Sequence, residues 1–311
     1  MRSLSFLRRI VVAASVFTAV AAGAISAQAQ ASLAPKDDRV SALDIKLHSG
    51  ITLNYVVQGD VHGPVIVLLH GAGDSWHSYQ RVLPLLPQRY RVYAVTLRGH
   101  GLSDHPETGY SRDDFAGDIL QFLDELKLEH VTLVGHSLGS FVAQKVAERD
   151  TAGHLSRLVL IGSGPGVRKA GSAESDLSGP FASLKDPIPY TFARDFQAST
   201  IYYPVPAWFF EMMVGESQRV PAATWHGLSK SILGGGSLDD LKKIKVPTLL
   251  LWGEKDSIFH REDQQTLLNT IPHATLKAYP ETGHALHWER PVEFTHDLLA
   301  FIQGSAIKTK P

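Results

Sequence analysis

Short, uninterrupted apolar runs recur along the chain, separated by stretches that carry apolar residues at helical spacing. A strand that is buried on both faces of a parallel sheet reads as a continuous apolar run, whereas a half-exposed strand alternates apolar and polar residues. Residues 42–48 and 51–57 are predicted to form an antiparallel hairpin that opens the sheet. The buried strands are predicted at residues 65–69, 92–95, 131–134, 158–161, 248–251 and 275–279.

Helical spacing is clearest in two of the segments between these strands. Phe115, Ile119 and Phe122 lie three or four residues apart, and Phe141 and Val146 belong to a second such set. Strands that alternate with helices along the chain are typical of an α/β protein. We therefore predict a mostly parallel, doubly wound sheet with helices on both faces.

The interval 163–245 breaks this alternation. It contains no clear strand, and stretches rich in Gly, Ser and Pro bracket its aromatic, helix-like pieces. Because a structureless loop of this length is uncommon in a compact domain, we predict an inserted helical cap. The α/β core then consists of residues 32–162 and 246–311.

The N-terminal segment has the pattern of an export signal. The basic pair Arg8–Arg9 precedes an apolar run over residues 10–22, and two A-x-A sites end at Ala29 and Ala31. A charged start, a short apolar stretch and small residues at the cleavage site are typical of a secretory signal peptide. We predict that residues 1–31 are such a signal, that Sec or twin-arginine export delivers the protein to the periplasm or the medium, and that no stable membrane anchor remains.

Composition and charge exclude several classes of protein. Hydrophobic residues make up 44% and charged residues 20%, which excludes a disordered or collagen-like chain. A net charge of −1 gives no reason to expect a nucleic acid as partner. The absence of cysteine excludes disulfides and thiolate chemistry, and the 15 histidines form no compact ligand pattern, so neither a metal nor a cofactor is predicted.

The segment Gly135-His136-Ser137-Leu138-Gly139 fits the pattern G-x-S-x-G. It directly follows the predicted strand 131–134 and precedes a helix predicted to begin near Ser140. In this strand–turn–helix setting the pattern is typical of a nucleophile elbow. The two glycines allow strand and helix to approach closely, while the serine takes a strained conformation that exposes its Oγ above the sheet.

Together with three further motifs, the elbow makes the chain resemble the α/β-hydrolase family over roughly residues 40–303. Residues 70–73, with the sequence HGAG, are similar to the family's oxyanion-hole loop, and residues 98–103 resemble the turn after its fourth strand. Gly283-His284, followed by Glu289-Arg290-Pro291, resembles its histidine loop. The resemblance implies the α/β-hydrolase fold with an inserted helical cap, but it selects no substrate because this fold hosts many chemistries.

Serine is a weak nucleophile unless an adjacent base takes its proton. The resemblance implies the chain order serine, acid, histidine, which places the base near the C-terminus. His284 and His287 both qualify by position. His284 lies in the loop directly after the strand 275–279 and is the predicted base, while His287 is assigned a structural role or a place at the pocket edge.

The acid orients the imidazole and stabilises its charged form. The resemblance places it after the sixth or the seventh strand. Only glycine, serine and proline follow Ile161, whereas Glu254 and Asp256 follow the later strand. Asp256 matches the family position and is the predicted acid. Glu254 is the alternative, with a solvated loop charge as its other role.

The oxyanion of the transition state requires hydrogen-bond donors that are already in place. The backbone N–H of Leu138, directly after the nucleophile, is the first predicted donor, and the resemblance implies the backbone N–H of Ala72 as the second. His70 is predicted to organise the loop that carries Ala72. Arg98 and Asp104 are predicted to hold the neighbouring loop together.

Apolar side chains of the insertion are candidates for the roof of a substrate pocket. The predicted pocket residues are Trp208, Phe209 and Met212 in the cap, with His136 in the elbow and Trp76 just past the oxyanion loop. Each cap residue could instead belong to the core of the cap. Taken together, so apolar a cap implies a pocket suited to carbon-rich small molecules.

These residues predict a serine hydrolase that cleaves carboxylic esters, or related acyl bonds, of small to medium apolar substrates through an acyl-enzyme. A carbon–carbon bond hydrolase, a lactonase and a perhydrolase use the same triad and are alternatives. A non-catalytic ligand-binding homologue is the alternative from another class. Serine at position 137 argues against haloalkane dehalogenases and epoxide hydrolases, which carry a carboxylate there.

Overall fold

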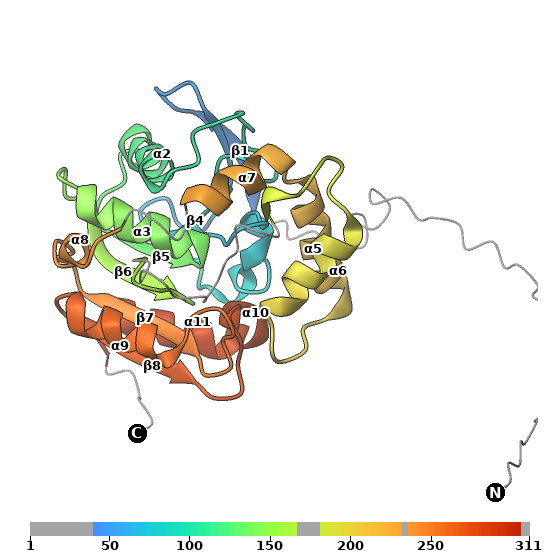
Figure 1. Ribbon diagram of the computed structural model, residues 1–311. Coiled ribbons are helices and arrows are strands. Elements are labelled where there is room, and N and C mark those ends of the chain that lie inside the picture. Colours follow the sequence, from blue (N-terminus) through green and yellow to red (C-terminus); the bar gives the residue numbers. More distant parts are fainter. Residues whose placement is uncertain (1–39, 167–180, 232–235, 306–311) are drawn as a thin grey trace, which may run out of the picture. The chain divides into compact units, whose positions relative to one another are not determined.

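Eight strands form one sheet in the computed structural model, which describes residues 40–166, 181–231 and 236–305 (Figure 1). Their order across the sheet is β1-β2-β4-β3-β5-β6-β7-β8. The strands β1 and β2, and β2 and β4, pair antiparallel, and every other neighbouring pair is parallel. The strands span β1 Ser41–Lys46, β2 Thr52–Gln58, β3 Val65–Leu69, β4 Arg91–Val95, β5 Val131–His136, β6 Leu155–Ile161, β7 Thr248–Gly253 and β8 Ala274–Tyr279.

The predicted hairpin and parallel strands are therefore confirmed, with boundaries that differ by a few residues. The helices are η1 Trp76–Tyr79, η2 Leu83–Leu85, α2 Arg112–Glu125, α3 Leu138–Arg149, α5 Tyr190–Ser199, α6 Ala207–Arg219, α7 Ala222–Ser231, α8 Leu238–Leu241, α9 Arg261–Thr270, α10 Leu286–Glu289 and α11 Pro291–Ile302. Local sequence sets some of these boundaries. The helix α2 begins at a capping box, in which the Ser111 and Asp114 side chains each accept a hydrogen bond from the other residue's amide.

Both faces of the sheet are buried, which explains the uninterrupted apolar runs. In β3, Val67 and Leu69 belong to one hydrophobic cluster, whereas Ile66 and Leu68 belong to another on the opposite face. Helices α2, α3 and α9 pack on the first cluster. The helices η1, η2 and α11 pack on the second. The fold is thus a three-layer α/β structure, as predicted.

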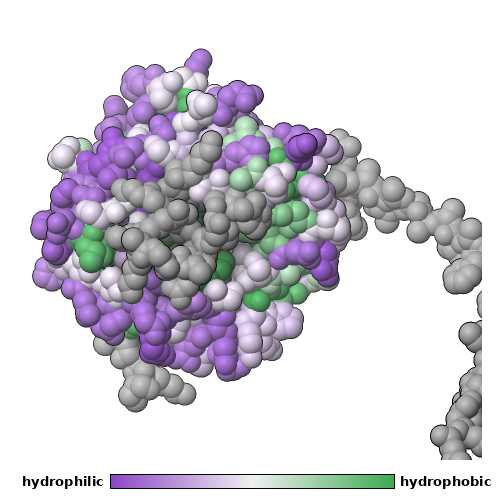
Figure 2. Space-filling view, in the orientation of Figure 1, coloured by the Kyte–Doolittle hydropathy of each residue, from purple (hydrophilic) through white to green (hydrophobic). Residues whose placement is uncertain are grey.

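The helices α5 to α8 all lie between β6 and β7, where the sequence predicts an inserted cap. An aromatic cluster that includes Phe181, Phe196 and Trp225 joins α5 to α7. Most of the face drawn in Figure 2 is hydrophilic, and hydrophobic residues gather at its right, over α5 and α6. The short helix α8 differs from the other three helices, because its last residue, Leu241, packs into the large hydrophobic cluster of the core, as does Ile244 just after the helix.

Two parts of the sequence interpretation lie outside the described residues, namely the signal peptide over residues 1–31 and the segment 167–180 of the predicted cap. Among the helices that are described, none has both the length and the apolar character needed to cross a membrane.

Candidate active site

Ser137 stands at the sharp turn between β5 and α3. Its backbone has φ 51° and ψ −114°, a left-handed conformation that costs a non-glycine residue of order 1–3 kcal/mol. A Cβ atom at Gly135 would lie 2.2 Å from the carbonyl oxygen of Gly139, and one at Gly139 would lie 2.5 Å from that of Leu69. Glycine is therefore required on both sides of the turn, as the elbow motif predicts.

A histidine and a carboxylate from two later loops meet beside this turn. The Nδ1 atom of His284 lies 2.8 Å from Oδ2 of Asp256, and both side chains are buried. The other oxygen of Asp256 accepts the backbone amides of Ile258 at 2.8 Å and Phe259 at 3.0 Å. Because the carboxylate only accepts, Nδ1 donates the proton, and Nε2 has no hydrogen-bond partner among the described residues.

The loop that carries His284 is also fixed to the insertion. Gly283, which precedes His284, donates its amide to Glu289 at 3.0 Å. The same carboxylate accepts the amides of Tyr203 at 2.8 Å and Tyr202 at 3.2 Å. The acidic residue of the histidine-loop motif thus joins this loop to the segment before α6.

The alternative base and acid lie elsewhere. His287 is fully buried beside Ser78, with 3.1 Å between its Nε2 and the serine Oγ, and burial lowers the pKa of His287 to about 3. Glu254 is exposed and pairs with Arg261 at 3.2 Å. The structure therefore brings Asp256, and not Glu254, to His284.

The loop after β3 carries the predicted oxyanion donor Ala72. His70 holds this loop through two hydrogen bonds, from its Nδ1 to the carbonyl of Gly71 at 2.7 Å and from the amide of Leu97 to its Nε2 at 2.9 Å. Burial and the neighbouring His100 lower the pKa of His70 well below its usual range, so the ring is neutral and can serve both bonds. His70 thus organises the loop, as predicted.

The two proposed oxyanion amides are free to donate to a ligand, as far as the described residues show. In the described ranges of the chain, the N–H groups of Ala72 and Leu138 donate no hydrogen bond. Both residues line the same cavity as Ser137 and His284. Leu138 is also the first residue of α3, where backbone N–H groups point toward anions.

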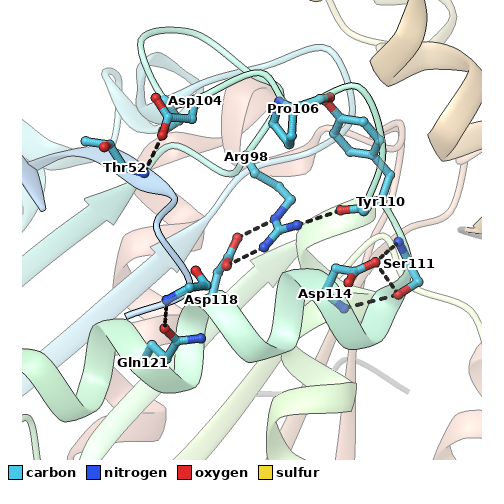
Figure 3. Close-up of polar contacts among 12 residues, drawn as sticks. Thr52, Arg98, Asp104, Pro106, Tyr110, Ser111, Asp114, Asp118 and Gln121 are labelled. Atoms are coloured by element: carbon cyan, nitrogen blue, oxygen red, sulfur yellow. Dashed lines mark hydrogen bonds and ion pairs between the residues drawn. The ribbon is translucent and has the colours of Figure 1, made fainter. Parts of the chain in front are cut away.

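Arg98 and Asp104 hold the loop between β4 and α2, as the sequence predicts (Figure 3). The Nε and Nη2 atoms of Arg98 donate to the two carboxylate oxygens of Asp118, each at 2.5 Å, and Nη1 donates to the carbonyl of Gly109 at 2.8 Å. Asp104 accepts the amide of Thr52 at 2.7 Å. These contacts are structural and lie outside the cavity lining.

A cavity of about 270 Å³ lies over the elbow. Ser137, His284, Ala72, Leu138 and the predicted pocket residue His136 all line it. Apolar and aromatic side chains form much of the remaining wall, among them Phe141, Phe181, Phe196, Ile258, Phe259 and Trp288.

The other four predicted pocket residues do not line this cavity. Trp208 is 46% exposed to solvent, on the outside of α6. Phe209 and Met212 pack against Trp288 and its neighbours instead. Trp76 stacks on the ring of His77 and packs against the core. The prediction was wrong for these residues because the tertiary fold turns their side chains away from the elbow.

Four aromatic residues of the cavity wall were not identified from the sequence, and only two of them carry a signal there that could have revealed them. Phe259 and Trp288 follow Asp256 and His284 by three and four positions, so proximity to the predicted triad could have identified them. Phe181 and Phe196 lie in the insertion, where no spacing or motif distinguishes them from other aromatic residues.

A parallel sheet with a strained serine after β5, and an acid and a histidine on the loops after β7 and β8, defines the α/β-hydrolase class of fold. The sequence model of the alpha/beta hydrolase family matches residues 66–298, and the chain belongs to that family.

Individual relatives agree with this assignment. The chain is 30% identical over 271 residues to a non-heme haloperoxidase from Rhodococcus erythropolis, which covers 77% of this chain and 91% of that protein. An esterase from Exiguobacterium antarcticum matches with a TM-score of 0.77 at 24% identity, covering 85% of this chain and 100% of the other. An esterase from a Rhodococcus species matches with a TM-score of 0.75 at 25% identity, covering 86% and 100%. The protein is therefore a hydrolase-family member with esterases and haloperoxidases among its relatives.

Proposed function

We propose that the protein is a serine hydrolase that cleaves carboxylic esters through an acyl-enzyme. The observation that carries the proposal is the cavity that Ser137 and His284 share. The Nδ1 atom of His284 is bound to Asp256, and its Nε2 has no partner in the described part of the chain. A serine hydroxyl becomes a nucleophile when a neighbouring histidine can take its proton. The buried carboxylate that binds the other ring nitrogen keeps this histidine in the required tautomer.

In the proposed reaction, the Ser137 oxygen attacks the ester carbonyl while His284 Nε2 takes the serine proton. The amides of Ala72 and Leu138 stabilise the oxyanion, and His284 then gives its proton to the departing alkoxide. Water then enters and its oxygen attacks the acyl carbon while His284 takes a proton from it. The acyl–serine bond breaks, His284 returns the proton to the Ser137 oxygen, and the acid leaves. Asp256 keeps the imidazole in the required tautomer and stabilises its cationic form throughout.

The cavity supports a small, apolar substrate. Drug-sized ligands usually occupy pockets of roughly 300–1,000 Å³, and this cavity of about 270 Å³ lies below that range. Its aromatic wall offers a large apolar contact area and few hydrogen-bonding groups that would fix the orientation of a substrate. Aryl or alkyl esters with short to medium acyl groups fit this description better than long-chain lipids.

A panel of aryl esters with increasing acyl length tests the proposed substrate class. We expect kcat/KM of the wild type to peak at short or medium chains. Phe196→Ala should raise kcat/KM for longer chains by roughly tenfold, because an apolar pocket gains about 1–3 kcal/mol for each methylene that it can accommodate. Trp208→Ala is the matched control, since Trp208 lies outside the lining and its removal should leave the optimum unchanged.

Two outcomes would contradict this assignment. A wild-type optimum at long-chain lipids would exclude the small-substrate class. Failure of every ester, together with turnover of a lactone or a dienoic ketone, would reassign the same triad to lactone or carbon–carbon bond hydrolysis.

Perhydrolysis is a second candidate, favoured by the haloperoxidases among the relatives. Hydrogen peroxide would replace water as the nucleophile that attacks the acyl-enzyme, and a peracid would leave. Adding peroxide to the ester assay separates the two, because peracid should form only where perhydrolysis competes with hydrolysis.

We also propose that the mature protein is exported, on the evidence of the N-terminal pattern alone. Intact-mass analysis of protein from the periplasm or the medium should show a chain that begins at Gln30 or Ser32. A soluble cytoplasmic form that retains Met1 would contradict export.

A further inference from the structure

A second carboxyl group follows the oxyanion loop, belongs to a residue that lines the cavity and takes no part in the proposed triad. Asp74 follows the HGAG segment and is 2% exposed. Its amide donates to the carbonyl of Gly71 at 3.3 Å, which closes the turn that presents Ala72. The side chain therefore belongs to the same tight turn as the proposed oxyanion donor.

Hydrogen bonds tie this turn to two helices of the insertion. Gln197 on α5 donates its Nε2 to Oδ1 of Asp74 at 2.9 Å and to Oγ of Ser217 at 2.8 Å. Ser217 on α6 donates in turn to the carbonyl of Gly73 at 3.0 Å. Asp74, Gln197, Ser217 and Gly73 thus form a closed, buried ring that joins the turn to α5 and α6.

Among the residues that the structure describes, the titratable groups around the Asp74 carboxyl supply no positive charge. They are His136 on β5, at 4.0 Å from Oδ2, His287 on α10, Tyr79 on η1 and Glu216 on α6. Burial and the neighbouring imidazoles lower the pKa of His136 well below its usual range, and burial lowers the pKa of His287 to about 3. Burial, with a smaller effect of Glu216, raises the pKa of Asp74 to about 8, although hydrogen bonds oppose the rise. At neutral pH the group is therefore mainly a neutral acid.

A neutral acid satisfies the contacts of this site. Its carbonyl oxygen accepts from Gln197. Ser78 Oγ, 3.2 Å from Oδ2, donates to the ionised group, whereas the hydroxyl of the neutral acid donates to Ser78, whose own proton then turns to Nε2 of His287 at 3.1 Å. An ionised carboxylate in the same place would be a buried charge without a counter-ion, which is strongly unfavourable. Ionisation should therefore loosen the turn.

We propose that Asp74 is a positioning residue which, as a neutral carboxylic acid, holds the turn that carries the Ala72 amide against α5 and α6. The effect on turnover rests on the proposed hydrolase function, because it acts through the oxyanion donor. The effect on stability does not, so the two can be tested separately.

The stability test compares thermal unfolding of the wild type and Asp74→Asn between pH 4 and pH 9. The folded-state pKa is raised above the unfolded value of about 3.9, so the stabilisation is complete below the unfolded pKa and is lost as the pH rises through the folded pKa. Asparagine keeps one donor and one acceptor but cannot ionise. The melting temperature of Asp74→Asn relative to the wild type should therefore rise between about pH 4 and pH 8 and then level off.

Asp60→Asn is the matched control for the change from acid to amide. Asp60 is exposed, and within the described ranges its side chain accepts one hydrogen bond, from the amide of His62. The melting temperature of Asp60→Asn relative to the wild type should therefore not rise over the same pH interval. A difference for Asp74→Asn that stays flat with pH would overturn the proposal, because it would mean that Asp74 is ionised in the folded protein.

The turnover test measures kcat and KM against pH for Asp74→Asn and Asp74→Ala. We expect Asp74→Asn to keep most of the wild-type kcat at pH 7 and to retain it above pH 8, where the wild type declines. Asp74→Ala should lower kcat at every pH by up to about 10²-fold with little change in KM, because losing one oxyanion donor costs about 10²–10³ in kcat. Should Asp74→Ala fail to fold, Gln197→Leu removes the same link from the side of the cap and should lower kcat in the same way. Because Gln197 also lines the cavity, kcat and not KM is the readout for this variant.

Equal loss in Asp74→Asn and Asp74→Ala at pH 7 would overturn the proposal, since it would show that the charge of Asp74 is required. An alkaline decline that persists in Asp74→Asn would do the same. If the wild type cleaves no ester, the proposed function fails while the melting experiment still decides the protonation state of Asp74.

Discussion

Ser137→Ala is expected to reduce kcat for any ester by on the order of 10⁵-fold or more, and His284→Ala by a similar factor. Nucleophile and base act as one unit, so losing either leaves only the contribution of substrate binding and the oxyanion donors. For the same reason, the double variant should be no slower than either single variant. Steady-state kinetics together with labelling by a serine-directed phosphonate provide the measurement.

Ser156→Ala serves as the control for this experiment. Ser156 lies on β6, and its hydroxyl donates to the carbonyl of His130 at 2.8 Å, outside the cavity lining. This variant should be labelled and should turn over like the wild type. Substantial activity or labelling in Ser137→Ala would exclude Ser137 as the nucleophile and would point to another one. Absence of turnover and of labelling in the wild type would instead favour the ligand-binding homologue.

Much of the fold could be predicted because each sheet strand carries its own signal. In β3, residues that alternate between two hydrophobic clusters produce a run without polar interruption, and the same holds for β7. The elbow was predictable for a similar reason. The backbone approaches so closely at Gly135 and Gly139 that only glycine fits at these positions. Both glycines lie two positions from Ser137, so this steric requirement is visible as a short motif around the serine.

The wall of the cavity could not be predicted in this way. Trp208 and Phe196 are both aromatic residues on helices of the insertion, yet one is 46% exposed and the other faces the cavity. The position of the insertion on the core decides which side of each of its helices faces the elbow. The spacing of residues within one helix does not reveal this position. The bond from Gln197 to Asp74 shows the same limit, because the two residues are 123 positions apart.

Asp256→Asn is expected to reduce kcat by about 10⁴-fold while the protein remains folded. In the wild type, Oδ1 accepts two backbone amides, from Ile258 and Phe259, and Oδ2 accepts the proton of His284 Nδ1. The side-chain oxygen of an asparagine would stay on the backbone N–H groups of Ile258 and Phe259. In the flipped orientation, the NH₂ group of the side chain would face these two donors, which is unfavourable. Its NH₂ group would then face His284 and require Nδ1 to accept.

The proton of the imidazole would therefore move to Nε2, and the lone pair needed by Ser137 would be lost. Glu254→Gln is the matched variant, since it makes the same change from acid to amide two positions away. Glu254 is exposed and pairs with Arg261 at the surface, so this variant should change kcat by about twofold or less. Melting temperatures close to the wild-type value in both variants would show that the difference in kcat comes from the imidazole tautomer. A large loss in Glu254→Gln with a mild effect in Asp256→Asn would transfer the role of the acid to Glu254, despite its distance from His284 in the hydrogen-bond network.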